Sequence, residues 1–371
     1  MKEPKIRFKG FQGEWEIDKI GNFSTSFSGG TPTAGISAYY GGNIPFIRSG
    51  EIHEDKTELS LTEKGYNNSS AKIVEKGTLL YALYGATSGD VAISKIRGAI
   101  NQAILAIYPN KTVDKRFLAN YLQSHKQKIV GELLQGGQGN LSGALVKSIS
   151  VNYPNNREQQ AISDYVDSLD SQISASTSRL ASLKQMKAAS LQAMFPQEGE
   201  TVPKIRFKGF EGEWKKVKLG KLFSERIENN VDGEMLSVTM NNGIIKAAEN
   251  GRFDNSNSDK SKYKVVKVGD IAYNSMRMWQ GASGCSQYEG IVSPAYTVVV
   301  PNANIHSLFF AYLFKTIPMI NLFRLHSQGL TKDTWNLKYP AFSIIEVSYP
   351  ESKAEQQAIA SYFTSLDRQI S

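Results

Sequence analysis

Side chains that could perform catalysis are scarce in this sequence. Only four histidines occur among the 371 residues, and none belongs to a metal-ligand pair at helical or CxxC-type spacing. The sequence has no GxxxxGK(S/T) phosphate loop. The segment GATSG at 85–89 is not a GxSxG nucleophile elbow, because its serine stands in the wrong place. We therefore expect no catalytic residue, no metal site and no cofactor.

One segment comes close to a catalytic motif. SPAY at 293–296 resembles the (D/N/S)PP(Y/F) motif of adenine-N6 methyltransferases, in which that loop holds a flipped base. The second proline is missing and no glycine-rich cofactor motif accompanies it. Its counterpart in an internal repeat is NQAI at 101–104, which carries no such chemistry. The start of a strand is the favoured interpretation, and a degenerate adenine methyltransferase stays as an alternative.

Side chains suited to contacting DNA occur in glycine-rich loops. Lysine and arginine neutralise phosphates, while arginine, amide and hydroxyl side chains recognise base edges. The formal net charge of +8 favours an anionic partner, and nucleic acid is the commonest one. The candidate DNA-binding residues in the first half are Tyr39, Tyr40, Arg48, Thr87, Ser88, Asn101, Gln102, Gln135, Gln138 and Asn140. Those in the second half are Asn274, Arg277, Trp279, Arg324, Ser327, Gln328 and Thr331.

These loops belong to two copies of one sequence unit. PKIRFKGFQGEW at 4–15 returns as PKIRFKGFEGEW at 203–214, and EQQAI at 158–162 returns at 355–359. Between these markers the two copies align at an offset of 192, but their sequences differ strongly. Two copies are too few for a solenoid, so we expect two domains in tandem. Short apolar runs bounded by glycine and proline predict strand-rich bodies with helices near their ends.

A long helix is expected between the two copies. Arg157 to about Met194 contains neither glycine nor proline, and apolar residues recur there at alternating steps of three and four. Such a helix requires a partner, for which the second EQQAI segment is the candidate; a surface helix packed on one body is the alternative. The stripe residues, which are candidates for subunit docking, are Ile162, Val166, Leu169, Ile173, Leu180, Leu183, Ile359, Phe363, Leu366 and Ile370.

The composition also bears on the cellular compartment. The single cysteine, Cys285, excludes an intramolecular disulfide and fits a reducing cytoplasm. No apolar run approaches the ~20 residues that a membrane-spanning helix needs, and the first ten residues lack the apolar core of a signal peptide. We expect a cytoplasmic protein without a membrane partner.

The ordered combination of motifs resembles the specificity subunit of type I restriction–modification systems. The resemblance is carried by the two PKIRFKGF segments, by GGTPT and YYGGNIPFIRSGEI in the first body, and by the two EQQAI segments. It implies an α+β fold with two mixed, strand-rich target-recognition domains, separated by long helices that form an antiparallel coiled coil with pseudo-twofold symmetry. The implied division is 1–152 and 197–348 for the recognition domains, 153–196 for the central helix and 349–371 for a shortened distal helix.

The resemblance implies a role without catalysis. Each domain would recognise one half of a bipartite, asymmetric site in double-stranded DNA. The helices would set the spacing and dock two methyltransferase subunits, and restriction and motor subunits would complete the enzyme. A coiled-coil scaffold that binds a non-DNA ligand stays as a further alternative.

The distal helix raises a separate expectation. It has only 17 residues from Glu355 to Ser371. We expect it to leave Ile162, Val166 and Leu169 uncovered, so that the isolated chain self-associates or another chain covers this stripe.

Overall fold

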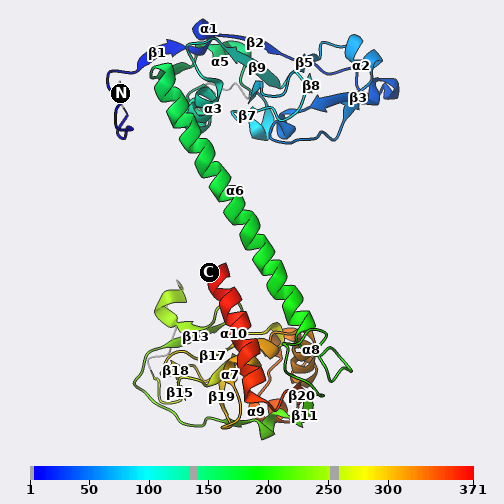
Figure 1. The fold of residues 1–371 in the computed structure, drawn as a ribbon, viewed down its shortest axis with the longest axis vertical. Helices are drawn as coiled ribbons and strands as arrows, with labels where there is room; N and C mark the ends of the chain where they lie inside the picture. Colours follow the sequence, from blue (N-terminus) through cyan, green and yellow to red (C-terminus); the bar gives the residue numbers. More distant parts are fainter. Residues whose placement is uncertain (1–3, 134–139, 251–258) are drawn as a thin grey trace. The chain divides into compact units, whose positions relative to one another are not determined.

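The chain consists of two compact units, Met1–Ser174 and Ala175–Ser371. The computed structural model describes residues 4–133, 140–250 and 259–371 (Figure 1). Each unit combines short strands and helices around cores of its own, as the pattern of short apolar runs predicts.

The first unit is built mainly of antiparallel strands. Strands β1 and β10 form a two-stranded sheet, and two four-stranded sheets have the orders β2-β9-β6-β7 and β4-β3-β8-β5. The pair β3 and β8 is parallel. The strands are β1 (Glu16–Lys19), β2 (Ser24–Ser28), β3 (Tyr40–Ile47), β4 (Ser60–Leu61), β5 (Lys72–Val74), β6 (Leu79–Ala82), β7 (Val91–Ile93), β8 (Gly98–Ile100), β9 (Ile104–Pro109) and β10 (Ser150–Tyr153). The shorter helices are α1 (Ile20–Phe23), α2 (Glu63–Asn67), α3 (Lys115–Ser124), α4 (Lys126–Leu133) and α5 (Gly143–Ser148), with 3-10 turns η1 (Ser37–Tyr39), η2 (Ser49–Glu51) and η3 (Gly85–Thr87).

The second unit repeats much of this plan. Strands β11 and β20 pair, the order β12-β19-β16-β17 matches the first four-stranded sheet, and β13-β14 and β15-β18 are two-stranded sheets. The strands are β11 (Lys215–Lys218), β12 (Phe223–Glu225), β13 (Leu236–Thr239), β14 (Gly243–Lys246), β15 (Lys264–Val266), β16 (Ile271–Asn274), β17 (Ser283–Cys285), β18 (Gly290–Val292), β19 (Tyr296–Pro301) and β20 (Glu346–Tyr349). The helices are α7 (Ser307–Leu313), α8 (Ile317–His326), α9 (Tyr339–Ser343) and α10 (Lys353–Ile370), with 3-10 turns η4 (Leu219–Lys221), η5 (Ala247–Asn250), η6 (Met278–Gln280) and η7 (Lys332–Thr334).

The register of the strands confirms the predicted internal repeat. Leu80 lies opposite Ala106 in the pair β6 and β9. Ala272 lies opposite Val298 in the pair β16 and β19. Both residues of the second pair follow those of the first by 192 positions, which is the offset that the sequence alignment predicts. The divergent bodies are therefore two copies of one fold.

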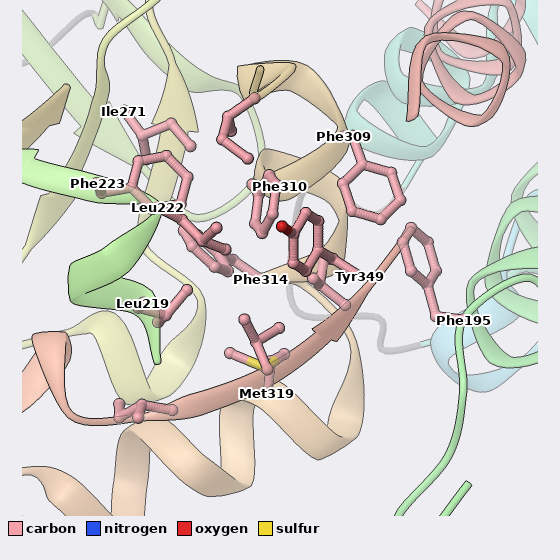
Figure 2. Close-up of a cluster of buried hydrophobic side chains, with 14 of the residues drawn as sticks. Phe195, Leu219, Leu222, Phe223, Ile271, Phe309, Phe310, Phe314, Met319 and Tyr349 are labelled. Atoms are coloured by element: carbon pink, nitrogen blue, oxygen red, sulfur yellow. The ribbon is translucent and has the colours of Figure 1, made fainter. Parts of the chain in front are cut away.

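Aromatic rings form the main core of the second unit. Figure 2 shows Phe223, Phe310 and Phe314 beside one another; Phe223 lies edge-on to Phe310 with centroids 5.1 Å apart. Phe195, which follows the long helix, packs against Phe309 at 5.5 Å. Burying each such side chain contributes about 1.5–3 kcal/mol, so this cluster anchors the surrounding strands and helices firmly.

The predicted long helix is present as α6, Asn156–Ala193. The side-chain oxygen of Asn155 accepts the amide N–H of Glu158 at 3.1 Å and satisfies a donor at the beginning of the helix. The absence of glycine and proline lets the helix continue for 38 residues, and Pro196 follows its end.

Helix α10 pairs with the last turns of α6 inside the second unit. Lys187 Nζ donates to Asp367 Oδ1 at 2.5 Å, and the hydroxyls of Ser190 and Tyr362 lie 2.9 Å apart. A later residue of α6 thus contacts an earlier residue of α10, so the two helices run antiparallel here. This pairing agrees with the expectation that the second EQQAI segment is a partner of the long helix.

The structure corrects the expectation for part of the apolar stripe. Ile162 is partly buried against the core of the first unit, so the expectation that it lacks a cover is wrong. Val166, Leu180, Leu183 and Ile370 are also partly buried. Ile359, Phe363 and Leu366 are buried in the core of the second unit. Leu169 and Ile173 are 39% and 64% exposed, and for these two the docking role stays a prediction.

No single helix in the described ranges is long and apolar enough to cross a membrane. The bent pair α7 and α8 is long and apolar enough for a membrane span only when the two helices are counted together. Its large apolar side chains include Phe309, Phe310 and Phe323, which are buried in the protein core.

Candidate nucleic-acid interface

The repeated PKIRFKGF segments bind the beginnings of the two EQQAI helices. Arg7 Nε and Nη2 donate to the two carboxylate oxygens of Glu158 at 2.8 and 2.7 Å. Arg206 makes the same two bonds to Glu355 at 2.7 and 2.8 Å. Glu158 and Glu355 are each only 1% exposed. Each pair is therefore a bidentate clamp largely withdrawn from water, and the hydrogen bonds that Arg206 donates to Glu355 raise the pKa of Arg206.

The following glutamine of each EQQAI segment fixes the body of its unit. Gln159 Oε1 accepts the amide N–H of Asp114 at 2.7 Å, and its Nε2 donates to the carbonyl of Pro154 at 2.7 Å. Gln356 Oε1 accepts the amide N–H of His306 at 2.9 Å, and its Nε2 donates to the carbonyl of Pro350 at 2.8 Å. Both side chains are fully buried. Sequence reasoning recognised EQQAI as a marker but missed this role; the identity of the segment in both copies was the available signal.

A cavity of about 480 Å³ collects three of the predicted residues of the first unit. Tyr40, Arg48 and Asn101 line it together with Thr31 and other residues. Tyr40 donates its hydroxyl to the carbonyl of Pro32 at 3.1 Å. Tyr39, at the end of η1, does not line this cavity. The structure thus brings together one aromatic side chain from β3, one cationic side chain that directly follows β3, and one amide side chain from the β8–β9 connection.

Arg48 is already engaged by two carboxylates. Its Nε lies 3.0 Å from Glu51 Oε2, and its Nη2 lies 2.5 Å from Glu58 Oε2. The hydrogen bonds that Arg48 donates to these two carboxylates raise its pKa. A guanidinium held in this way is oriented, but part of its charge is compensated before any phosphate or base approaches.

The other predicted residues of the first unit have mostly local partners. Ser88 donates its hydroxyl to the carbonyl of Leu83 at 3.1 Å, and Thr87 has a weaker bond of 3.5 Å to Tyr84. Gln102 Oε1 accepts the hydroxyl of Thr31 at 2.5 Å. Such bonds fix the loop and leave fewer groups for a ligand. Asn140 is exposed, while Gln135 and Gln138 lie outside the described residues.

In the second unit the connection between β16 and β17 presents an arginine and a tryptophan. Arg277 is exposed and forms no ion pair with any residue that the structure describes. Trp279 donates its Nε1–H to the carbonyl of Met276 at 3.0 Å and lies edge-on to Trp335, with centroids 5.3 Å apart. Asn274 Oδ1 accepts the amide N–H of Met276 at 3.0 Å. Arg277 is therefore an exposed cation on an ordered turn.

A second loop lies beside this turn. The amide N–H of Leu337 donates to the carbonyl of Ser275 at 2.8 Å, and the Trp279–Trp335 contact joins the same two segments. Gln328 exchanges backbone hydrogen bonds of 3.0 and 2.8 Å with Asn336, which closes the loop containing Thr331. The structure therefore places the loop of Gln328 and Thr331 next to that of Trp279, which the sequence spacing of about 50 residues did not reveal.

Two further predicted residues lie near this loop at the end of α8. Ser327 donates its hydroxyl to the carbonyl of Phe323 at 2.7 Å and is therefore occupied locally. Arg324 is exposed and lines a different cavity of about 750 Å³, next to residues 196–201 and β20.

SPAY forms the connection between β18 and β19. Tyr296 begins β19, which agrees with the interpretation as a strand start. Ser293 Oγ accepts the amide N–H of Ala295 at 3.4 Å. Across the described residues, no group of three or more His, Cys, Asp or Glu side chains is arranged to hold a metal ion.

Comparisons with known proteins point to one family. Residues 12–185 match the family model described as the type I restriction modification DNA specificity domain. The MjaIX specificity subunit of a type I restriction enzyme from Methanocaldococcus jannaschii is 32% identical over 168 residues, which are 42% of this chain and 38% of that protein. The HindI specificity subunit from Haemophilus influenzae is 26% identical over 133 residues, or 34% of this chain and 29% of that protein. The matches thus span well under half the length of these curated relatives.

A solved structure is similar over the whole chain. The S subunit of a type I restriction–modification system from M. genitalium has a TM-score of 0.58 and 14% sequence identity, and the match covers 99% of this chain and 92% of that one. At this identity the likeness concerns the fold alone. The predicted fold class, two strand-rich α+β units in tandem with long helices, is confirmed by this similarity.

Proposed function

We propose that this chain, whose residues 12–185 match the family model described as the type I restriction modification DNA specificity domain, is the DNA specificity subunit of a type I restriction–modification enzyme. The observation that carries the proposal is the duplicated frame. The same arginine–glutamate clamp and the same buried glutamine hold two bodies whose loops differ. A shared frame with different recognition loops suits a protein that reads two different half-sites.

Under this proposal the chain has four functional segments. Residues 1–152 and 197–348 are the two target-recognition domains, 153–196 is the central helix and 349–371 is the beginning of the distal helix. The observed units divide inside α6, between Ser174 and Ala175, so each contains part of the central helix. In the complete assembly the helical segments set the spacing between the two half-sites.

Recognition in the second domain depends on the two adjoining loops. Arg277 is suited to donate two hydrogen bonds to the major-groove edge of a guanine, because it is exposed and carries no competing ion pair in the described structure. The side-chain amide of Gln328 is suited to adenine, and Thr331 adds a hydroxyl. Exposed lysines supply contacts to phosphate, which account for affinity and orientation.

Recognition in the first domain uses the cavity of Tyr40, Arg48 and Asn101. Because Glu51 and Glu58 already hold Arg48, we assign it the role of an oriented base contact rather than a phosphate contact. Thr87, Ser88, Gln102 and Asn140 belong to neighbouring loops and complete the proposed surface.

We further propose that the chemistry resides on other subunits. Methyltransferase subunits, two by the pseudo-twofold logic, dock on the helical segments, where Leu169 and Ile173 are exposed. Restriction and motor subunits join this assembly, which acts in the cytoplasm. The chain itself needs no cofactor in this role.

A selection experiment tests the proposed function. The purified chain, alone and with its methyltransferase subunits, is incubated with a pool of random 40-bp duplexes, and the bound DNA is sequenced. Two short motifs separated by a constant gap are expected, with affinity that falls steeply as salt rises. Methyl transfer by the chain alone would favour the degenerate methyltransferase, and salt-insensitive or absent DNA binding would favour the scaffold.

A further inference from the structure

Lys315 connects two loops of the second unit. It lies between α7 and α8, where it is largely withdrawn from water. Its Nζ donates to the carbonyl of Met240 at 2.9 Å and to the carbonyl of Gly281. Met240 belongs to the turn between β13 and β14, and Gly281 closes the connection between β16 and β17. One ammonium group therefore holds two loops that are distant in sequence.

The loop that ends at Gly281 carries the exposed Arg277 and the half-buried Trp279. Gly281 has a φ of +81°, a left-handed conformation that favours glycine, and its N–H donates to the carbonyl of Met278 at 2.8 Å. A Cβ at this position would lie 3.6 Å from Lys315 Cδ, so the lysine stem packs directly beneath the turn. The backbone path of the Arg277 loop thus depends on the contact between Lys315 and Gly281.

In the first unit, the lysine near the equivalent helix junction pairs with a carboxylate instead of with backbone carbonyls. Lys126, the first residue of α4 directly after the junction with α3, forms an ion pair with Asp90, which follows Gly89 at the end of the β6–β7 turn. The position equivalent to Asp90 in the second unit is Ala282. No carboxylate in the described part of the chain pairs with Lys315, whose recorded acceptors are two carbonyls.

An ammonium group without a counter-ion is unfavourable in this environment. Burial lowers the pKa of Lys315 to about 8, and repulsion from Lys187 acts in the same direction. Lys187 itself forms an ion pair with Asp367 on α10, which balances its charge. An apolar side chain of similar length would avoid this cost. Stability of the core alone therefore does not account for a lysine at this place.

We propose that Lys315 is a positioning residue for DNA recognition: it fixes the β16–β17 and β13–β14 loops so that Arg277 and Trp279 meet the duplex in one arrangement. The inference rests on the proposed function, because it assigns specificity in one half-site to a residue that does not touch DNA. It identifies a determinant of that specificity outside the recognition loops.

The test compares variants at the two helix junctions. The full-length chain, with its methyltransferase subunits, is used to select from the random 40-bp duplex pool as wild type, Lys315→Met, Lys315→Gln and Lys126→Met. Lys315→Met is expected to lose sequence preference in one half-site, with enrichment reduced about tenfold or more, while the other half-site is unchanged. Lys315→Gln keeps two N–H donors and is expected to retain most of that preference. Lys126→Met is the matched control and leaves the half-site of the second unit intact.

The alternatives are distinguishable. Unchanged preference in a folded Lys315→Met, or equal loss in both half-sites, overturns the positioning role. If Lys315→Met does not fold, Lys315→Gln is tested instead. Hydrogen exchange of the 277–282 amides is then measured in Lys315→Gln, and the proposal expects these amides to be as protected as in the wild type. Loss of preference by a folded Lys315→Gln whose 277–282 amides stay as protected as in the wild type also overturns the proposal, because the loop would then still be held in place. If the wild type selects no motif, the proposed function fails and not this inference alone.

Discussion

Removing Arg206 leaves the carboxylate of Glu355 buried without its cation. Glu355 is 1% exposed, and both of its oxygens accept from Arg206, at 2.7 and 2.8 Å. Breaking a buried pair by deleting one partner costs about 3–5 kcal/mol. Arg206→Met is therefore expected to destabilise the second unit by that amount, which with an m-value of about 2 kcal/mol/M lowers its urea midpoint by roughly 2 M.

The double variant Arg206→Met/Glu355→Gln tests whether the uncompensated buried charge causes this loss of stability. In Arg206→Met/Glu355→Gln no charge remains buried, and the amide oxygen can still accept from Trp214 Nε1, which lies 3.3 Å from the carboxylate. We expect it to be about 2 kcal/mol more stable than Arg206→Met alone, because most of the single-variant cost is an uncompensated charge. Urea unfolding is followed by tryptophan fluorescence in a Trp15→Phe background, which leaves three tryptophans, all in the second unit.

The matched pair in the first unit provides the control. Arg7→Met and Arg7→Met/Glu158→Gln change the equivalent clamp, whose bonds are 2.8 and 2.7 Å long. These variants should affect the first unit and leave the transition of the second unit in place. A cost below about 1 kcal/mol for Arg206→Met, or strictly additive effects in the double variant, would refute the reasoning that the clamp is buried and coupled.

Three further predictions concern recognition, protonation and association. Arg277→Ala should change base preference in one half-site in the duplex selection; uniform weakening with a salt slope smaller by about one would identify a phosphate contact instead. Burial lowers the pKa of Lys315 from its ordinary 10.5 to about 8, so the unfolded chain binds more protons between these values and folded-state stability should rise with pH across that window. Thermal unfolding at pH 7.5 and 10 should show this rise, about 1–2 kcal/mol after allowance for screening, in wild type relative to Lys315→Met; equal pH profiles would contradict it. Light scattering of the isolated chain should detect self-association that Leu169→Glu/Ile173→Glu abolishes. A monomeric wild type at high concentration would argue against association through the exposed apolar side chains of Leu169 and Ile173.

Much of the fold was predictable because its signals are local or repeated. Alternating and helical periodicities report which face of an element is apolar, and they predicted strand-rich bodies and the helix that the structure places at Asn156–Ala193. The offset between the copies predicted the equivalent strand registers of β6–β9 and β16–β19. The stripe on α10 was also recognised, but periodicity could not tell that Phe363 contacts its own core.

The candidate interface was predictable only in part. Loop composition nominated Arg48 and Arg277 equally, since both are arginines in glycine-containing segments. The structure separates them: Arg48 is held by Glu51 and Glu58, whereas Arg277 is exposed without an ion pair in the described residues. Lys315 gave no sequence signal, because its acceptors are backbone carbonyls that any residue type supplies.

The sequence by itself determined that the protein is a duplication with a nearly constant frame, divergent bodies and a long helix. It did not determine what the doubled PKIRFKGF segments do. Only the tertiary structure shows that Arg7 reaches Glu158 across 151 positions and that Arg206 reaches Glu355 across 149. Periodicity and composition describe neighbours along the chain, whereas a clamp between distant residues depends on the path that packing imposes on the segments between them.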